Sequence, residues 1–115
     1  MIQQEDKTFI EGCIAGDVRI QTAFIRQFSN LVYRSIQAAS KARSGMLSPE
    51  DFEDLHNTVF LKLFDRNCKK LNQFEGKNGC SLASWIRMIS VQTVLDHFRK
   101  TKDALAVPRR MIPID

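Results

Sequence analysis

The sequence predicts an all-α protein, a compact bundle of about four helices. Apolar residues recur at the spacing of a helix face in four separate segments, and glycine and proline residues divide the chain between them. The alternation of apolar and polar residues that marks a strand never holds beyond four residues. Helices that each carry one apolar face are expected to pack those faces around a single core.

The size and composition point to one globular domain. The chain has 115 residues, too few for a two-domain enzyme. Hydrophobic residues make up 43% of it and charged residues 26%, a balance that argues against disorder throughout. No apolar run approaches the roughly 20 residues of a membrane span, and no signal segment opens the chain. We therefore expect a soluble, cytoplasmic protein without a membrane span.

The first two predicted helices span residues 6–15 and 18–42. Between them, Gly16 is suited to end the first helix in a left-handed conformation, and Asp17 is suited to cap the second. The residues expected to face inward from the first helix are Phe9, Ile10, Cys13 and Ile14. Those expected to face inward from the second are Ile20, Phe24, Phe28, Leu31, Val32, Ser35 and Ala39.

The third predicted helix spans residues 49–68. Ser48 followed by Pro49 is typical of an N-cap and a first helical position. The inward line of this helix comprises Phe52, Leu55, Val59, Phe60, Leu63 and Phe64. Residues 69–81, which contain two glycines and two asparagines, are expected to form a loop anchored by Leu71 and Phe74.

The fourth predicted helix spans residues 82–102, with Ser81 as its N-cap. Its inward residues are expected to be Leu82, Trp85, Ile86, Ile89 and Thr93. Beyond it, Pro108 and Pro113 predict an extended tail, because proline disfavours helix. We therefore place one helical domain at residues 1–105 and the start of a linker, or a disordered tail, at residues 106–115.

The charge is unevenly distributed along the chain. Residues 1–61 hold six basic and eight acidic side chains, whereas residues 62–115 hold eleven and five. A basic second half indicates a polyanionic partner, and a merely solvated basic surface is the alternative.

Neither a metal centre nor an enzyme active site is predicted. Cys13, Cys68 and Cys80 match no zinc-binding spacing, so we expect reduced thiols and no cofactor. The acidic residues between Glu50 and Asp54 suit the positive N-terminal end of a helix. Neither histidine has a serine or cysteine beside it in the sequence. A small helical enzyme or metal protein is kept as the least favoured hypothesis.

The fourth helix and the loop before it carry the residue types of a nucleic-acid interface. Arginine and lysine contact phosphates, amide side chains contact base edges, and aromatic rings stack on bases. Trp85 suits either stacking or a place in the core. The candidate DNA-binding residues are Lys77, Asn78, Trp85, Arg87, Gln92, Arg99 and Lys100.

Three segments in order resemble region 2 of bacterial sigma-70-type factors, specifically the extracytoplasmic-function group. Residues 85–100, WIRMISVQTVLDHFRK, resemble the W-L-x-x-I-A-x-N-x-x-x-D-x-x-R-R/K motif of regions 2.3 and 2.4. Residues 53–64, EDLHNTVFLKLF, resemble the region 2.2 pattern E-D-L-V-Q-E-V-F. Gly16-Asp17, Ala23-Phe24 and Val32-Tyr33 resemble the run that opens region 2.

The resemblance implies a role in transcription initiation. Such a domain docks on the clamp coiled coil of core RNA polymerase through region 2.2. It then recognises and melts the promoter −10 element by holding the non-template single strand, with one base flipped into a pocket of the loop before region 2.3. Asp54 and Leu55 match the docking motif, and Asn57 and Thr58 complete the candidate docking residues. Val59 and Phe60 match the motif too, but they suit the core equally. Trp85, Asp96, Arg99 and Lys100 fall in the promoter-facing motif.

The chain departs from the family pattern in ways that motivate a second hypothesis. Asn57 and Thr58 stand where the family has Gln and Glu, His56 replaces an apolar residue, and Gln92 replaces the usual Asn. The alternative is therefore a sigma-like protein-interaction module, docking-deficient or bound by an anti-sigma factor, without promoter activity of its own. Nothing after Lys102 could supply region 4, so we expect one domain excised from a longer factor, or a one-domain sigma-like protein.

Overall fold

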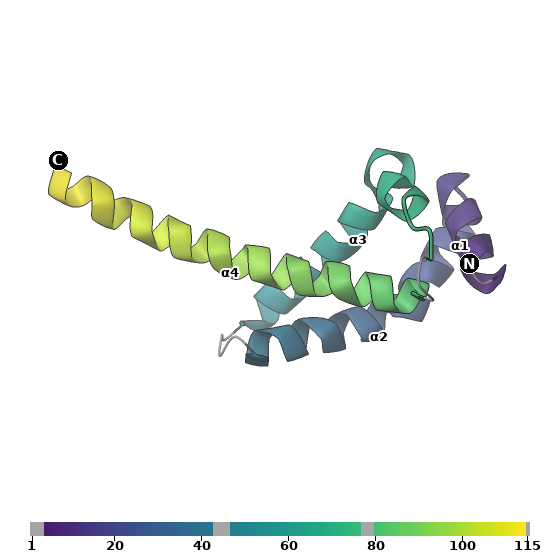
Figure 1. Cartoon of the computed structure of the whole chain (residues 1–115), viewed down its shortest axis with the longest axis horizontal. Coiled ribbons are helices and arrows are strands. Elements are labelled where there is room, and N and C mark those ends of the chain that lie inside the picture. Colours follow the sequence, from purple (N-terminus) through teal and green to yellow (C-terminus); the bar gives the residue numbers. More distant parts are fainter. Residues whose placement is uncertain (1–3, 43–46, 77–79, 115) are drawn as a thin grey trace.

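The computed structural model describes residues 4–42, 47–76 and 80–114, with side chains up to Lys100. Within them lie four helices and no strand, so the all-α prediction is confirmed (Figure 1). The helices are α1 (Gln4–Ile14), α2 (Val18–Ala42), α3 (Pro49–Asn72) and α4 (Leu82–Ile114). The predicted residues Lys77 and Asn78 lie outside the described residues.

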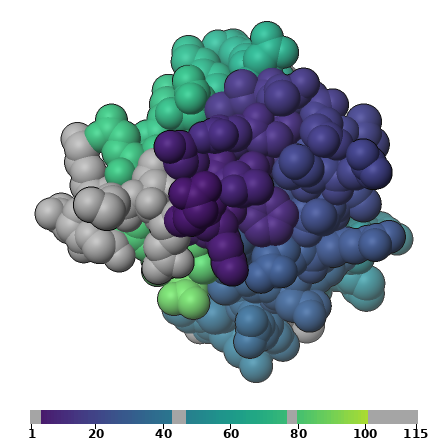
Figure 2. All heavy atoms as spheres, turned by 90° about the vertical axis from the view of Figure 1, so that its right-hand side faces the viewer, coloured from purple at the N-terminus to yellow at the C-terminus, as the bar shows by residue number. Residues whose placement is uncertain are grey.

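The core lies where α1, α2, α3 and the first half of α4 meet. Its centre is the fully buried ring of Phe24, whose centroid lies 4.9 Å from that of Phe28 and 5.8 Å from that of Phe9. From α3, the Phe60 and Phe64 rings approach it to 6.2 and 5.6 Å. The Phe24–Phe28 pair is tilted and the other three pairs meet edge-on, and such edge-on pairs each add about 0.5–1.5 kcal/mol beyond the burial of their area. Figure 2 shows α1, in purple, covering one end of this bundle.

The helices begin at the caps that the sequence predicts. Gly16 has a φ of 81°, and the Asp17 carboxylate accepts hydrogen bonds from the backbone N–H groups of Arg19 and Ile20. The Ser48 hydroxyl accepts from the N–H of Asp51, whose carboxylate accepts in return from the N–H of Ser48, which completes a capping box. The Ser81 hydroxyl likewise accepts from the N–H of Ser84.

The predicted loop over residues 69–81 is wrong in its first part, because α3 continues to Asn72 after an interruption. Arg66, Asn67 and Cys68 all have positive φ, from 53° to 60°, and break the regular helix. Cys68 is buried and its thiol donates to the carbonyl oxygen of Cys13, at 3.3 Å. The fully buried Leu71 holds the segment that follows. These contacts with the core form a last helical turn in a segment whose composition suggested a loop.

The prediction of an extended tail is also wrong, because α4 continues through Pro108 to Ile114 and crosses the expected domain boundary at residue 105. A helix that is already formed continues without a new nucleation cost. A proline within it removes one backbone hydrogen bond, at roughly 3 kcal/mol, without necessarily ending it. Figure 1 shows this half of α4 projecting from the bundle, and the chain measures 57 × 28 × 27 Å.

The inward-facing residues follow the prediction with one clear exception. Ile14 was expected in the core but is 38% exposed, because α1 ends there. Ile36, which the predicted stripe omitted, is fully buried. Leu71 and Phe74 are buried as expected, although Leu71 lies in α3 and not in a loop. No helix in the described part of the chain has the length and apolarity needed to cross a membrane.

Candidate nucleic-acid interface

Two adjoining hollows lie beside the N-terminal half of α4. The first, which we name the basic hollow, measures about 450 Å³ and lies between the end of α3 and α4. It is lined by Lys62, Asp65, Arg66, Lys69, Lys70, Gln73, Ile89, Gln92 and Asp96. The second, the loop pocket, measures about 340 Å³ and is lined by Gln73, Phe74, Glu75, Gly76, Cys80 and Trp85. Gln73 lines both hollows, so they meet at this residue.

The loop pocket has an aromatic wall. The ring centroids of Phe74 and Trp85 lie 5.2 Å apart, with the rings tilted by 42°. Phe74 is buried, whereas Trp85 is half-buried and packs against the core while lining the pocket. The two interpretations of Trp85, core residue and stacking surface, are therefore compatible. An aromatic wall of this kind suits the flat face of an aromatic ring such as a nucleobase.

Asp96 is the carboxylate most involved with the surrounding cations. It accepts a hydrogen bond from the Arg99 guanidinium at 2.8 Å, and its other oxygen lies 3.9 Å from the Lys62 amine. All three side chains are at least one third exposed, so each ion pair contributes at most about 1 kcal/mol. These ion pairs fix the position of Arg99, because Asp96 holds its side chain against α4.

Lys62 is a partly buried cation of the basic hollow. Its amine donates to the Thr93 hydroxyl at 2.9 Å. Burial lowers the pKa of Lys62, and the nearby positive charges of Lys70 and Lys100 lower it further, while Asp96 raises it. Among the charged neighbours of Lys62, Asp96 has the largest effect on this pKa, and Lys70 and Lys100 act in the opposite direction.

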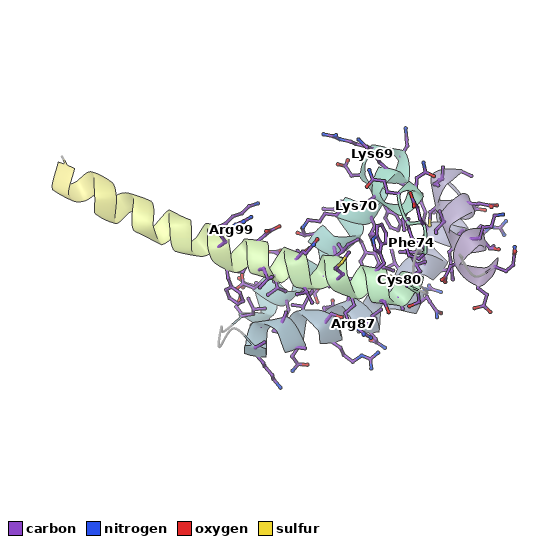
Figure 3. All side chains as sticks on the ribbon, in the orientation of Figure 1. Lys69, Lys70, Phe74, Cys80, Arg87 and Arg99 are labelled. Carbon is purple, nitrogen blue, oxygen red and sulfur yellow. The ribbon has the colours of Figure 1, made fainter. Side chains whose placement is uncertain are left out.

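The predicted DNA-binding residues divide between two sides of α4. Gln92 lines the basic hollow, and Arg99 and Lys100 are exposed further along the helix. Figure 3 shows Arg87 on the side toward α2, away from Lys69, Lys70 and Arg99. Arg87 lines neither hollow, because a separation of five residues turns it about 140° from Gln92 around the helix. It does not join the other predicted residues.

The predicted docking residues lie on α3, and one of them is inaccessible. Asp54 and Asn57 are exposed, and the half-buried Thr58 donates its hydroxyl to the carbonyl oxygen of Asp54 at 2.7 Å. Leu55 is only 5% exposed and packs in the core, so it cannot contact a partner directly. The face of α3 with Asp54 and Thr58 also carries Leu61, which is 68% exposed and was not predicted as a docking residue.

The structure brings Ser29 to the buried His56, a pairing that the sequence did not indicate. Its hydroxyl lies 2.8 Å from the His56 Nε2 atom, and the imidazole stacks on Tyr33 with ring centroids 4.2 Å apart. His56 Nδ1 lies 3.3 Å from the side-chain oxygen of Asn57. Neither Ser29 nor His56 lines either hollow, so this contact joins α2 to α3 and offers no substrate site.

The sequence analysis did not predict four cationic residues that line the basic hollow: Lys62, Arg66, Lys69 and Lys70. In the sequence they stand at positions i, i+4, i+7 and i+8, the spacing of a helix face, although the structure turns the chain at residues 66–68 between them. That periodicity was present, but the last two residues were assigned to a loop. No three His, Cys, Asp or Glu side chains gather into a metal site among the described residues.

No protein-family model matches the chain, and neither the curated proteins nor the solved structures include a match.

Proposed function

We propose that this chain is the promoter-recognition domain of a sigma factor, which docks on core RNA polymerase and recognises and melts the −10 element. The observation that carries the proposal is the aromatic loop pocket, which opens beside a helix carrying Gln92, Arg99 and Lys100. A base held by Trp85 and Phe74 and a backbone held by cations are the two requirements for gripping a single strand. The sigma-like motifs of the sequence support the same role.

The energetics require no nucleotide hydrolysis. Opening DNA costs roughly 1.4 kcal/mol for each base-pair step, together with the unstacking of any flipped base. A protein that binds the open strand better than the duplex shifts the equilibrium toward opening by that difference in affinity. Stacking on an aromatic side chain contributes about 1–3 kcal/mol for each base, so stacking in the loop pocket offsets the cost of opening about one base-pair step. The remaining energy comes from phosphate contacts and from polymerase.

Docking on polymerase would be the task of the exposed face of α3. Asp54, Asn57, Thr58 and Leu61 lie on it, and Asp54 is an exposed acidic residue available to a basic partner. Attachment to a large complex on the promoter raises the effective concentration of the domain near the −10 element. On this proposal the chain works in the bacterial cytoplasm, with the clamp coiled coil and the non-template strand as partners and without a cofactor.

The fluorescence of Trp85 provides a direct test, because it is the single tryptophan of the chain. Titration with a single-stranded −10-type oligonucleotide is expected to quench its emission as a base stacks in the loop pocket. Matched duplex should quench it less, and the midpoint should rise with salt. Emission that is unchanged by single strands up to high micromolar concentration, at low salt, would refute this use of the pocket.

A second experiment tests docking separately. Asp54→Ala is expected to weaken binding to a polymerase clamp fragment, whereas Glu5→Ala, which removes an exposed carboxylate from α1, should not. Leu55→Ala is unsuitable because Leu55 is buried and its truncation would destabilise the fold. Equal affinities of the two acidic-residue variants would contradict docking through Asp54.

A sigma-like interaction module is the second candidate, and the exposure of Leu61 favours it. A leucine that is 68% exposed beside Asn57 and Thr58 makes this face less charged than the family pattern and suits an apolar partner such as an anti-sigma factor. Salt-dependent binding of single strands by the isolated chain favours the promoter role. Its absence, together with capture of a partner that Leu61→Asp abolishes, favours the module.

A further inference from the structure

We propose that the basic hollow binds one phosphodiester group of the single strand, adjacent to the nucleotide whose base enters the loop pocket. The cations come from α3, the helix that the sigma-like pattern assigns to polymerase docking. This inference rests on the proposed function, and it adds a phosphate site built by Lys62, Arg66, Lys69 and Lys70.

The charge of the hollow favours an anion. Four cationic side chains line it against the carboxylates of Asp65 and Asp96. Asp96 already contacts Arg99 and Lys62. Within the described part of the chain, no carboxylate lies within ion-pair distance of Lys69 or Lys70. Both of these lysines are exposed, so their charges remain available to a ligand.

The backbone holds these lysines in place. Three consecutive non-glycine residues with positive φ, Arg66 to Cys68, form an unfavourable turn that persists only where the surroundings determine it. Here the buried Cys68 and Leu71 anchor the segment on either side of Lys69 and Lys70. Figure 3 shows both lysines projecting from this last turn of α3 on the same side of α4 as Arg99.

The connection between the two hollows identifies the ligand as a strand. Gln73 lines both of them, so a group bound in one lies next to a group bound in the other. A polymer that places a flat aromatic ring beside a negative backbone group fits both hollows at once. Single-stranded nucleic acid has this chemistry, whereas an acidic peptide would leave the Phe74–Trp85 wall without a matching ring.

The test compares a double variant with a control that loses the same charge. Lys69→Gln with Lys70→Gln neutralises the hollow, and Arg34→Gln with Lys41→Gln removes two exposed cations from α2, outside it. Binding of a fluorescent single-stranded −10-type oligonucleotide is followed by anisotropy across a salt series. The hollow variant should bind the oligonucleotide about fivefold more weakly than the native chain. The slope of log affinity against log salt concentration should become shallower by roughly 0.7 for each phosphate contact removed. The control should change little in either quantity.

Oligonucleotides with single neutral methylphosphonate linkages then locate the phosphate. One linkage should weaken binding to the native chain while leaving the Lys69→Gln, Lys70→Gln variant unaffected, because the contact is already lost. If the native chain binds but the hollow variant matches the control, the phosphate site is refuted while the proposed function stands. If the native chain does not bind single strands at all, both are refuted. Circular dichroism of the variants checks that these exposed substitutions leave the fold intact.

Discussion

Gly12→Ala should have two opposing effects on the free energy of unfolding, a gain in the helix propensity of α1 and a steric clash at the contact between α1 and α2. In the interior of a helix, alanine is more favourable than glycine by about 1 kcal/mol, so the substitution would stabilise an isolated α1. In the folded chain, however, a Cβ atom at Gly12 would lie 2.4 Å from Cδ1 of Ile20, 2.6 Å from its Cγ2 and 3.0 Å from its Cβ. The outcome depends on whether Ile20 can move away.

The structure indicates that it cannot do so fully. Rotation of the end of the side chain can displace Cδ1, but Cγ2 and Cβ are held by the stiff β-branched geometry and the α2 backbone. Carbon atoms pack best at about 3.5–4.0 Å, so α1 must shift away from α2. Overpacking of this kind costs about 1–3 kcal/mol, which exceeds the gain in helix propensity. We expect Gly12→Ala to lower the free energy of unfolding by about 1 kcal/mol.

Urea denaturation of a double-mutant cycle measures this competition. Ile20→Ala removes the two closest atoms and leaves only the Cβ atom at 3.0 Å, so in that background the cost of Gly12→Ala should be smaller by about 1 kcal/mol or more. Gly16→Ala is the control, because its Cβ would meet no atom within 4 Å and its effect comes from a φ of +81° instead. That cost should be the same with and without Ile20→Ala. A Gly12→Ala chain more stable than the native one would refute the close packing of α1 on Ile20.

Four further predictions concern local structure, ionisation and thiol accessibility. Ser48→Ala removes the capping box of α3 and should lower the free energy of unfolding by about 1 kcal/mol, as urea titration would measure; an unchanged midpoint would contradict the cap. Asn67→Val should cost about 1–2 kcal/mol because Asn67 has a φ of 56°, whereas Asn67→Gly should be tolerated, and equal costs would contradict the left-handed turn. Burial, together with the nearby Cys68, raises the pKa of the Cys13 thiol from 9.0 to about 12. The unfolded chain therefore loses this proton at a lower pH than the folded chain does. The contribution of Cys13 to the free energy of unfolding should then fall as pH rises above about 9. In the same folded state, Ellman's reagent should label the half-buried Cys80 well before Cys13 and Cys68, and rapid labelling of all three would contradict their burial.

The local features of the fold could be predicted because their causes lie within a few residues. The Ser48–Pro49 start of α3 and the Gly16–Asp17 junction depend on side chains that bond to backbone groups two or three positions away. The inward stripe of α2, centred on Phe24 and Phe28, follows from helical periodicity. The sequence also placed a base-stacking candidate at Trp85, which lines the loop pocket.

The errors occurred where distant contacts oppose a local preference. Composition predicted a loop directly after residue 68, but burial of Cys68 against α1 and of Leu71 in the core forms a further turn of α3. Leu55 matched a docking motif, yet the neighbouring helices bury it.

By itself, the sequence determined that the chain forms helices, where most of them begin, which of their faces are apolar, and that the second half is basic. Those properties depend on hydrogen bonds and periodicities that span one or two helical turns. Only the tertiary structure decided that Lys62, Lys70 and Gln92 surround one hollow and that Gln73 joins it to the aromatic wall of Trp85. The reason is that such a site requires α3 and α4 to be brought together and α3 to be turned at residues 66–68, and the burial of Cys68 against the carbonyl of Cys13, 55 positions earlier, holds that turn.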